Sequence, residues 1–142
     1  MADERTLHVE IVTPDGEVYH EDVDMVVLPG IDGELGILPR HQPLVTLLAV
    51  GETRIRHGDD WDYVATGIGY AQVLFDRVLV VVDHGELAGA IDVRRAEEAV
   101  LRAKERLQER GDPGDQAEVD YFRAEQALKR AENRLRVSRR VG

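Results

Sequence analysis

The 142-residue chain contains no cysteine, which removes several chemistries at once. Disulfide bonds, thiolate zinc sites and a cysteine nucleophile are all excluded. Long apolar runs are also missing: no stretch approaches the roughly 20 apolar residues of a membrane span, and the opening MADERTLHVE has no apolar signal segment. These absences predict a soluble protein of a cytosol-like compartment that reaches a membrane only through a complex.

Positive charge is scarce in this chain. The net charge is −10, so the phosphate backbone of a nucleic acid would repel it, and a general nucleic-acid binder is not expected. The five histidines show no HxH or HxxxH spacing, which leaves no sequence signal for a metal site. The acidic residues have the pattern of solvated strand faces and turns. An enzyme built on paired carboxylates or a histidine-bound metal is therefore not predicted.

The charge that is present is divided unevenly. Residues 1–90 hold 5 Lys and Arg against 17 Asp and Glu, whereas residues 91–142 hold 13 against 11. A composition break of this size indicates two modules, which we assign to residues 1–88 and 89–142. Hydrophobic residues make up 43% of the chain, which is enough for a core, so wholesale disorder is not expected.

The first module has the pattern of many short strands. TLHVEIVTP (6–14) alternates apolar and polar residues, the period of a strand with one buried face. Turn sequences such as PDG (14–16) and GDD (58–60) separate stretches of this kind, and the second of them suggests a β-hairpin. Short strands with close turn signals predict a sandwich or a flattened barrel.

The second module changes to helical spacing. Apolar residues recur at intervals of three and four through residues 93–107 and again through 121–135, which lines one face of each of two helices. RGDPGDQ (110–116) supplies the Gly and Pro that end one helix and turn the chain. Alanine at several seam positions lets two helices approach closely, so an antiparallel hairpin is predicted. Because such a seam buries little area, the hairpin should be only modestly stable and is a candidate moving part.

The junction between the modules carries an unexplained pair of arginines in AIDVRRAEEAVLRA (90–103). Asp92 suits a helix N-cap, whereas Arg95 would lie near the positive end of the helix dipole, where a cation is slightly unfavourable. Local propensity therefore does not explain two arginines in the first turn. An anionic ligand such as phosphate would, because exposed N–H groups, the dipole and guanidinium groups all favour it.

Four stretches give the chain a family resemblance: TPDGEVY (13–19), GELGILPRHQPLV (33–45), IDVRRA (91–96) and ALKRAENRLRV (127–137). In this order, and over nearly the whole chain, they resemble the epsilon subunit of the rotary F-type ATP synthase. One departure is YVATGIGYAQV (63–73), where the family usually has a Ser-Gly-Gly-Phe turn. We expect a local difference in that turn and no change of fold.

The resemblance implies a flattened ten-stranded β-sandwich followed by an antiparallel two-helix hairpin, in agreement with the two periodicities. It implies a non-catalytic rotor-stalk subunit that binds the gamma subunit and the membrane ring of c subunits. Such a subunit couples rotation to the alpha/beta catalytic hexamer, and its C-terminal helices can restrain ATP hydrolysis. The expected location is the cytoplasmic face of a bacterial membrane, as a peripheral part of a proton-translocating complex.

A first set of site residues follows from the resemblance. The loop with Glu34, Arg40 and His41 matches the part of the sandwich that faces the polar loops of the c-ring. We expect it to contact the ring or gamma, because surface loops with a constrained backbone tend to carry function. The alternative is a loop that its glycines and prolines merely shape, with solvated charges.

A second set concerns ATP as a regulatory ligand. The segment IDVRRA (91–96) resembles the ATP-binding motif of certain bacterial epsilon subunits, which also use a glutamate before the helix and two arginines on the second helix. The matching residues are Glu86, Ile91, Asp92, Arg95, Ala96, Arg130 and Arg134. In an antiparallel hairpin the three arginines can converge on one phosphate group, while Glu86 and Asp92 contact the adenosine end.

Each of these residues also has an ordinary explanation. Asp92 alone is most often a cap, and Arg130 and Arg134 alone are most often solvated charges of an amphipathic helix. Arg94 points about a quarter turn away from Arg95 and is interpreted as a surface charge. The chain has no GxxxxGK[ST] sequence, so a hydrolytic P-loop is not predicted.

The resemblance further implies a conformational switch in the hairpin. ATP would hold the two helices folded against the sandwich, and low ATP would let them extend along gamma and block wasteful hydrolysis. The C-terminal arginines are interpreted either as contacts for acidic loops of the catalytic beta subunits or as a solvated tail. They are Arg134, Arg136, Arg139 and Arg140.

One rival interpretation stays open at this point. The sandwich could be a binding module, for example for sugars, whose hairpin serves as a coiled coil for oligomerisation. It predicts self-association through the helical stripes and no need for gamma.

Overall fold

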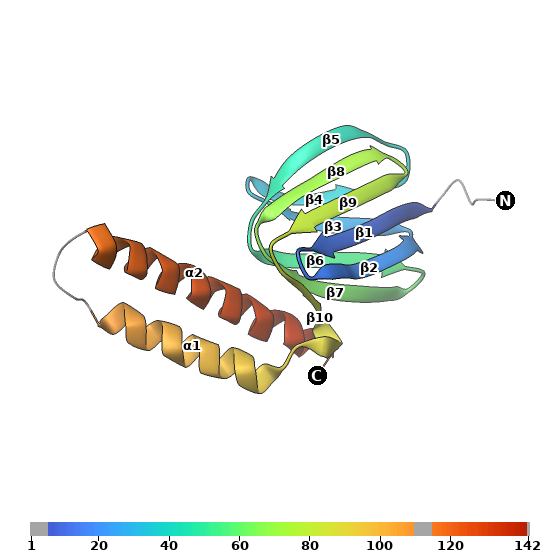
Figure 1. Cartoon of the computed structure of the whole chain (residues 1–142). Coiled ribbons are helices and arrows are strands. Elements are labelled where there is room, and N and C mark those ends of the chain that lie inside the picture. The colour runs from blue at the N-terminus through green and yellow to red at the C-terminus, as the bar shows by residue number, and fades with distance from the viewer. Residues whose placement is uncertain (1–5, 110–114, 142) are drawn as a thin grey trace.

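In the computed structural model, which describes residues 6–109 and 115–141, ten strands are followed by two long helices (Figure 1). The strands are β1 Leu7–Thr13, β2 Gly16–Val23, β3 Met25–Gly30, β4 Gly33–Ile37, β5 His41–Leu48, β6 Gly51–His57, β7 Asp60–Thr66, β8 Gly69–Phe75, β9 Arg77–Val82 and β10 Gly85–Leu87. The helices are α1 (Val93–Gln108) and α2 (Asp115–Ser138), with short 3-10 turns η1 (Ala88–Ala90) and η2 (Arg139–Val141). This confirms the predicted sandwich and hairpin.

The strands form one sheet in the order β10-β7-β6-β3-β5-β8-β9-β1-β2, with β4 paired to β3. Among the described strands, neighbours pair antiparallel except β1 and β9, which are parallel. The two ends of the sheet come together, since β2 contacts β6 and β10. There the Tyr19 hydroxyl on β2 donates a hydrogen bond to Asp62 Oδ2 on β7 at 2.9 Å. The sheet is thus folded over itself.

Alternating apolar residues form the core between the two layers. On β1, Leu7, Val9 and Ile11 are fully buried while the residues between them are partly exposed, as the period of two predicted. Leu28 on β3 and Ile55 on β6 are also fully buried and belong to the same cluster. The sandwich therefore has a continuous core of large aliphatic side chains.

Two predicted turns join strands at glycines with positive φ. β1 ends at Thr13 and β2 begins at Gly16, whose φ is 125°. Gly58, with a φ of 65°, lies between β6 and β7 and forms the expected hairpin turn. Glycine is the residue that adopts these backbone conformations readily.

The turn after β7, where this chain departs from the usual sequence, is crowded at Gly67. A Cβ atom added at Gly67 would collide with the side chains of Asp83 and His84, so a serine would not fit without a shift. The Gly67 amide donates to the His84 carbonyl at 2.9 Å, and the Asp83 amide donates to the Ile68 carbonyl at 3.0 Å. The difference is local, and the sandwich is retained.

The two helices pack along a seam of small side chains. Ala96 and Ala103 on α1 and Ala124 and Ala131 on α2 are each at most 3% exposed, which fits the predicted stripe. At its ends the stripe is exposed, as at Val93, because a terminal turn has neighbours on one side only. The hairpin interior thus contains alanine where the sandwich has leucine and isoleucine.

Two further points concern the helices. Among the described residues, neither helix combines the length and the apolar composition that a bilayer-crossing segment requires. The predicted turn RGDPGDQ (110–116) lies mostly outside the described residues, between the end of α1 at Gln108 and the start of α2 at Asp115.

The hairpin meets the sandwich near the C-terminal end of α2 and extends away from it (Figure 1). Val137 is fully buried there in a small apolar cluster with Ala65, Ala88 and Ile91, against which Tyr63 packs. This cluster is separate from the main core. A small contact area therefore holds a long pair of helices.

Candidate functional site

A pocket of about 680 Å³ lies in the angle between the sandwich and the hairpin. The β1–β2 turn, the start of β10 and both helices contribute to its wall. The lining residues are Thr13, Asp15, Gly16, Glu17, Val18, His84, Gly85, Glu86, Arg95, Ala99, Ala127, Arg130, Ala131 and Arg134. The volume falls within the range of roughly 300–1,000 Å³ that is common for small-molecule sites.

The helix side of the pocket is cationic. Arg95 from the first turn of α1 and Arg130 and Arg134 from α2 line it. Within the described part of the chain, no ion pair or hydrogen bond engages the guanidinium group of Arg95 or Arg130. Arg134 is paired: its Nε lies 2.8 Å and its Nη2 3.3 Å from the carboxylate of Glu86. Two unpaired guanidinium groups therefore border the pocket.

The sandwich side of the pocket is rich in acceptors. Three acidic residues line it: Asp15 from the β1–β2 turn, Glu17 from the start of β2 and Glu86 from β10. His84 stands beside them, with its Nδ1 2.8 Å from Asp83 Oδ1. The pocket is thus polarised, with donors and positive charge on one wall and acceptors and negative charge on the other.

The structure brings together four of the seven residues assigned to ATP. Glu86, Arg95, Arg130 and Arg134 line one pocket, although they come from three separate elements. This convergence depends on the antiparallel hairpin, which returns the C-terminal half of α2 to the start of α1.

The other three assigned residues lie beside the pocket and do not line it. Asp92 is the N-cap of α1, and its Oδ1 accepts a hydrogen bond from the Arg95 amide at 3.1 Å. Ile91 is buried in the small apolar cluster, and Ala96 is fully buried in the helix seam. In this conformation these three residues organise the start of α1, which positions Arg95.

Arg94 has the surface location that the sequence predicted. Its side chain is 89% exposed and its Nε lies 3.4 Å from Glu98 Oε1, one helical turn onward. It does not line the pocket, although its neighbour Arg95 does. The two adjacent arginines therefore form a matched pair for experiments.

The residues assigned to the ring contact were predicted to share a loop, which is wrong for two of them: Glu34 lies in β4 and His41 in β5, and Arg40 lies in the short turn between these strands. Glu34 is the second residue of β4, and Arg54 on β6 donates a hydrogen bond to its Oε2 at 2.7 Å. Arg40 has a positive φ of 66°, and His41 begins β5 with its Nδ1 2.7 Å from the Gln42 carbonyl oxygen. The backbone at Arg40 is constrained, as expected, while Glu34 has a partner that the sequence did not indicate.

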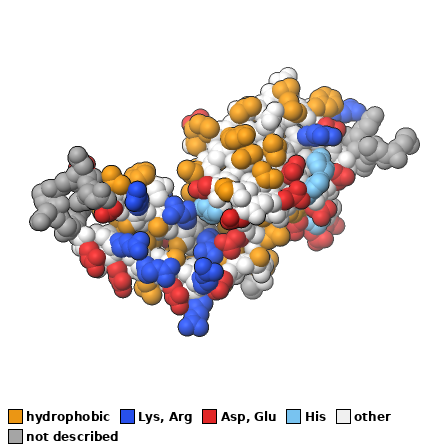
Figure 2. Space-filling model, viewed as in Figure 1, with side chains coloured by type: hydrophobic (Ala, Val, Ile, Leu, Met, Phe, Trp, Pro, Cys, Tyr) orange, Lys and Arg blue, Asp and Glu red, His pale blue; other side chains and the backbone are white. Residues whose placement is uncertain are grey.

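An apolar surface covers one outer face of the sandwich, over β5, β8 and β9 (Figure 2). Val45 and Leu47 on β5 and Tyr70 and Leu74 on β8 point outward, and Val45 is 68% exposed. Leu47 and Tyr70 are register partners in the sheet, so these side chains adjoin. We call these four residues the apolar face. Contiguous exposed apolar surface is a common feature of protein interaction sites.

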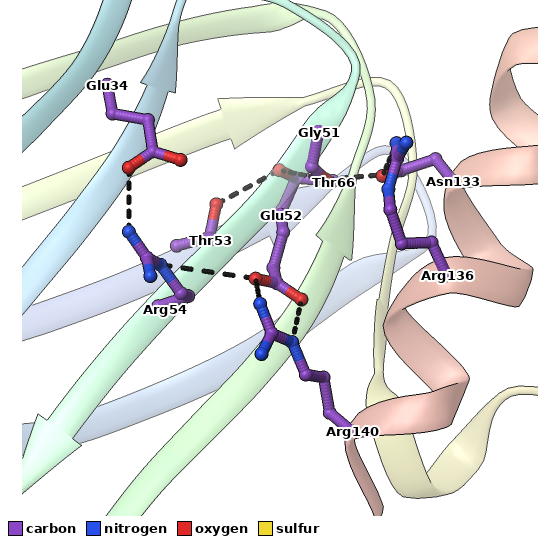
Figure 3. A network of polar contacts seen from close by, with 9 residues as sticks. All are labelled: Glu34, Gly51, Glu52, Thr53, Arg54, Thr66, Asn133, Arg136 and Arg140. Carbon is purple, nitrogen blue, oxygen red and sulfur yellow. Dashed lines mark hydrogen bonds and ion pairs between the residues drawn. The ribbon is translucent and has the colours of Figure 1, made fainter.

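A set of polar contacts between the end of α2 and strand β6 was not predicted (Figure 3). Asn133 is fully buried, and its Nδ2 donates to the Gly51 carbonyl at 2.8 Å. Arg140 donates to both carboxylate oxygens of Glu52, at 2.9 and 3.0 Å, and its guanidinium lies 4.8 Å from the centre of the Tyr63 ring. These contacts fasten the C-terminal end of the hairpin to the sandwich.

The position of Arg140 in this folded conformation was not predicted. Its side chain is 46% exposed, and its guanidinium group binds Glu52 of the same chain. The Arg136 side chain likewise donates to Asn133 Oδ1, at 3.1 Å. Glu52 was one acid among many in residues 1–90, and no local spacing pairs it with a residue 88 positions later.

Two family models match the chain. The β-sandwich domain of the ATP synthase delta/epsilon chain matches residues 6–88, and the long alpha-helix domain of the same chain matches residues 90–139. Among curated proteins, the ATP synthase epsilon chain of Halalkalibacterium halodurans is 49% identical over 135 residues, which cover 95% of this chain and 98% of that relative. The ATP synthase epsilon chain of Bacillus cytotoxicus is 48% identical over 134 residues, covering 94% and 97%.

Solved structures give the same architecture. A chain in a cryo-EM structure of the Euglena gracilis mitochondrial ATP synthase, with OSCP, F1 and c-ring, superposes with a TM-score of 0.74 at 21% identity and covers 91% of this chain and 79% of that one. A chain in the central stalk and c-ring of the Tetrahymena thermophila mitochondrial ATP synthase gives 0.51 at 17% identity, covering 95% of both chains. At these identities the likeness concerns the fold alone.

Proposed function

The chain belongs to the ATP synthase delta/epsilon family, and we propose that it acts as the epsilon subunit of a proton-translocating ATP synthase. In this role it is a non-catalytic rotor-stalk protein, held at the membrane by its complex, that links gamma and the c-ring to the alpha/beta hexamer. The relatives support this role because they match over nearly the full length of both chains. The rival of a sandwich-type binding module with an oligomerising coiled coil has no comparable support.

The apolar face and the β4–β5 segment with Glu34, Arg40 and His41 are the surfaces that we assign to the rotor. An apolar face is suited to gamma, a neighbour that stays bound, because binding removes the exposed apolar side chains from water. The polar segment with Glu34, Arg40 and His41 is suited to the polar loops of the ring, because charged groups at an interface give specificity.

Regulatory ATP is the ligand that best fits the polarised pocket. A nucleotide has an anionic triphosphate at one end and N–H and O–H donors at the other, which complement the arginine wall and the acceptor wall. The single observation that carries this proposal is the pair of unpaired guanidinium groups, Arg95 and Arg130, on the same wall of a pocket of suitable size. The phosphates would compete with Glu86 for Arg134, which Glu86 holds when no anion is bound.

Binding to this pocket would stabilise the folded hairpin, because the arginine wall forms only when the two helices pack together beside the sandwich. A ligand that binds only the folded form at 100 times its Kd stabilises that form by about 2.7 kcal/mol. The alanine seam and the small contact area make a shift of that size large enough to change which form dominates. High ATP would then keep the helices folded, and low ATP would release them to restrain hydrolysis.

The test uses the adjacent arginines as a matched pair. Full-length Arg95→Ala and Arg130→Ala variants are titrated with ATP by calorimetry, with Arg94→Ala as the control. Removing either guanidinium group should weaken binding roughly 10- to 100-fold, because each makes charge-assisted hydrogen bonds to phosphate, and the control should bind as the parent does. Equal weakening in all three variants, or none in any, would reject the pocket as the ATP site.

The regulatory part has its own test in the assembled complex. ATP hydrolysis is compared for the synthase with the full chain and with a chain that ends at residue 90. Removal of the hairpin should raise hydrolysis at low ATP and leave it nearly unchanged at high ATP. If the two complexes hydrolyse ATP equally at low ATP, the inhibitory role is wrong and the rotor role remains.

A further inference from the structure

Four charged side chains of alternating sign form a row from Glu34 on β4 to Arg140 near the end of the chain (Figure 3). Glu34 binds Arg54, Arg54 approaches Glu52, and Glu52 binds Arg140. They belong to three elements that are distant in sequence: β4, β6 and the η2 turn after α2. We call these four residues the charge row.

Glu52 is the anchor of this row. Its side chain is only 15% exposed, and both of its carboxylate oxygens accept hydrogen bonds from Arg140, at 2.9 and 3.0 Å. These hydrogen bonds, together with the negative charge of Glu52, raise the pKa of Arg140 above its ordinary value. A bidentate pair of this geometry depends on having both oxygens available.

Arg54 is the competitor for Glu52. Its Nη2 donates to Glu34 Oε2 at 2.7 Å, while its Nε lies 4.0 Å from Glu52 Oε1, which is beyond hydrogen-bond distance. Oε1 is also the oxygen that Arg140 Nη2 uses at 2.9 Å. Glu34 therefore occupies Arg54 and leaves both oxygens of Glu52 to the hairpin.

We propose that Glu34 controls how firmly the hairpin is fastened to the sandwich, by holding Arg54 away from the carboxylate that binds Arg140. When another cation takes Glu34, Arg54 turns toward Glu52 and competes with Arg140 for Oε1. The fastening at the end of α2 then weakens, and the helices leave the sandwich more often.

The charges determine whether each substitution loosens or tightens the hairpin. Loss of the negative charge at Glu34 frees Arg54 and makes the surroundings of Arg140 more positive, and both changes loosen the hairpin. Loss of the positive charge at Arg54 removes the competitor and should tighten the hairpin. Opposite signs for two partners of one ion pair are not expected if that pair only supports the fold, because then both losses would destabilise.

The cation that acts on Glu34 is a basic side chain of a protein docked on this part of the sandwich. The Glu34 side chain is 69% exposed, and the neighbouring loops expose two large apolar residues, Ile31 and Leu38. An exposed carboxylate suits a basic group on a polar loop of the docked protein, and the two apolar side chains add contact area beside it. This step rests on the proposed rotor contact, whereas the charge row itself acts in the isolated chain.

The test measures transient release of the hairpin through a single thiol. The chain has no cysteine, so Val137→Cys places one thiol in the fully buried contact between α2 and the sandwich. Its rate of reaction with a thiol reagent reports how often the helix leaves. Val73→Cys is the matched control, because Val73 is equally buried in the main core and becomes reactive only when the sandwich itself opens.

In the Val137→Cys chain, Glu34→Gln should raise the labelling rate about two- to fivefold, the range expected for an exposed ion pair, and Glu34→Lys should raise it further. Arg54→Gln should lower the rate. In a chain that already carries Arg54→Gln, Glu34→Gln should have little effect, because its competitor is gone. In the Val73→Cys chain none of these substitutions should change labelling by a similar factor.

Two results would overturn the proposal. One is an unchanged rate in Glu34→Gln, and the other is a rise in rate for both Glu34→Gln and Arg54→Gln. Asp76→Asn, which removes an exposed acid outside the row, guards against a general effect of net charge. All measurements use the isolated chain without ATP, so they can fail or succeed independently of the nucleotide site and the rotor contact.

Discussion

The sandwich and the hairpin bury their apolar side chains in different ways. The sandwich encloses large aliphatic residues such as Leu28 and Ile55 completely, between two layers of one continuous sheet. The hairpin buries chiefly alanines along its seam and touches the sandwich through a small cluster around Val137. Since burial of apolar area is the main stabilising term, we expect the sandwich to be the more stable part of the chain and the hairpin the less stable part.

This difference is useful for a rotor subunit. A rigid sandwich keeps its contact surfaces in place, while a weakly held hairpin can respond to a ligand or a neighbour that contributes only a few kcal/mol. The pocket and the charge row both include residues of the sandwich and residues of the hairpin end, so both depend on the junction between the two parts.

The largest expected effect comes from a leucine-to-alanine substitution, made once in the sandwich and once in the hairpin. Leu28→Ala in the sandwich should lower the free energy of unfolding by about 2–5 kcal/mol, because it leaves a cavity in a closed core. Leu128 in the helix seam is only half-buried, so Leu128→Ala should lower the free energy of unfolding by much less. Urea unfolding followed by the fluorescence of Trp61, the single tryptophan, reports on the sandwich because Trp61 lies on β7.

Helix content from circular dichroism, measured in the same urea series, reports on the hairpin. Leu128→Ala should shift that transition and leave the Trp61 transition in place. Equal shifts of the Trp61 transition in both variants would mean that sandwich and hairpin unfold as one unit, and the comparison would not hold.

A smaller effect is expected where the two parts join. Asn133→Ala removes the buried amide that donates to the Gly51 carbonyl and should weaken the docking of α2 by about 1–3 kcal/mol. In the Val137→Cys chain the thiol labelling rate should rise at least several-fold, while the Trp61 transition in urea stays where it is. Glu132→Ala, an exposed neighbour on the same helix, is the control. A lowered urea midpoint for the sandwich would show instead that Asn133 supports the sheet.

The smallest effect at neutral pH concerns the closure of the sandwich. Burial, followed by the hydrogen bond to Asp62, raises the pKa of the Tyr19 hydroxyl above its ordinary value. A raised folded-state pKa means that this contribution to stability is fully present below about pH 10 and is lost as the pH rises beyond that. Tyr19→Phe should lower the free energy of unfolding by about 0.5–1.5 kcal/mol at pH 8.

The difference in unfolding free energy between the parent and Tyr19→Phe should shrink above pH 10 and then reverse. Ionisation of the tyrosine favours the unfolded parent there, whereas phenylalanine has no proton to lose. Urea midpoints from pH 8 to pH 11 measure it, and the difference between the two proteins cancels other titrating groups. A difference that stays constant over this range would show that the hydroxyl is not held in its neutral form by the fold.

Much of the fold could be predicted because patterns among neighbouring residues specify it. The alternation in β1, the turn at Gly16 and the stripe through Ala96 and Ala103 each follow from neighbouring residues. The parallel pairing of β1 with β9 could not be predicted from residues alone, because no local pattern specifies a partner strand about 70 positions away.

The same limit separates the predicted from the unpredicted parts of the site. Glu86, Arg95, Arg130 and Arg134 were assigned through a motif resemblance, and the pocket that they share is a consequence of the hairpin. The bond between Asn133 and Gly51 joins residues 82 positions apart and depends on the angle between hairpin and sandwich. A polar residue inside a helix gives no sign of such a contact, since most are solvated.

The parallel pairing of β1 with β9 has a consequence for synthesis on the ribosome. β1 can pair with β2 as soon as both emerge, but its other edge has no partner until residues 77–82 are made. Long-range pairing of this kind slows folding, whereas helix formation is local and fast. We therefore expect the sandwich to set the pace of folding, and the C-terminal helices, made last, to dock on a sheet that has only just closed.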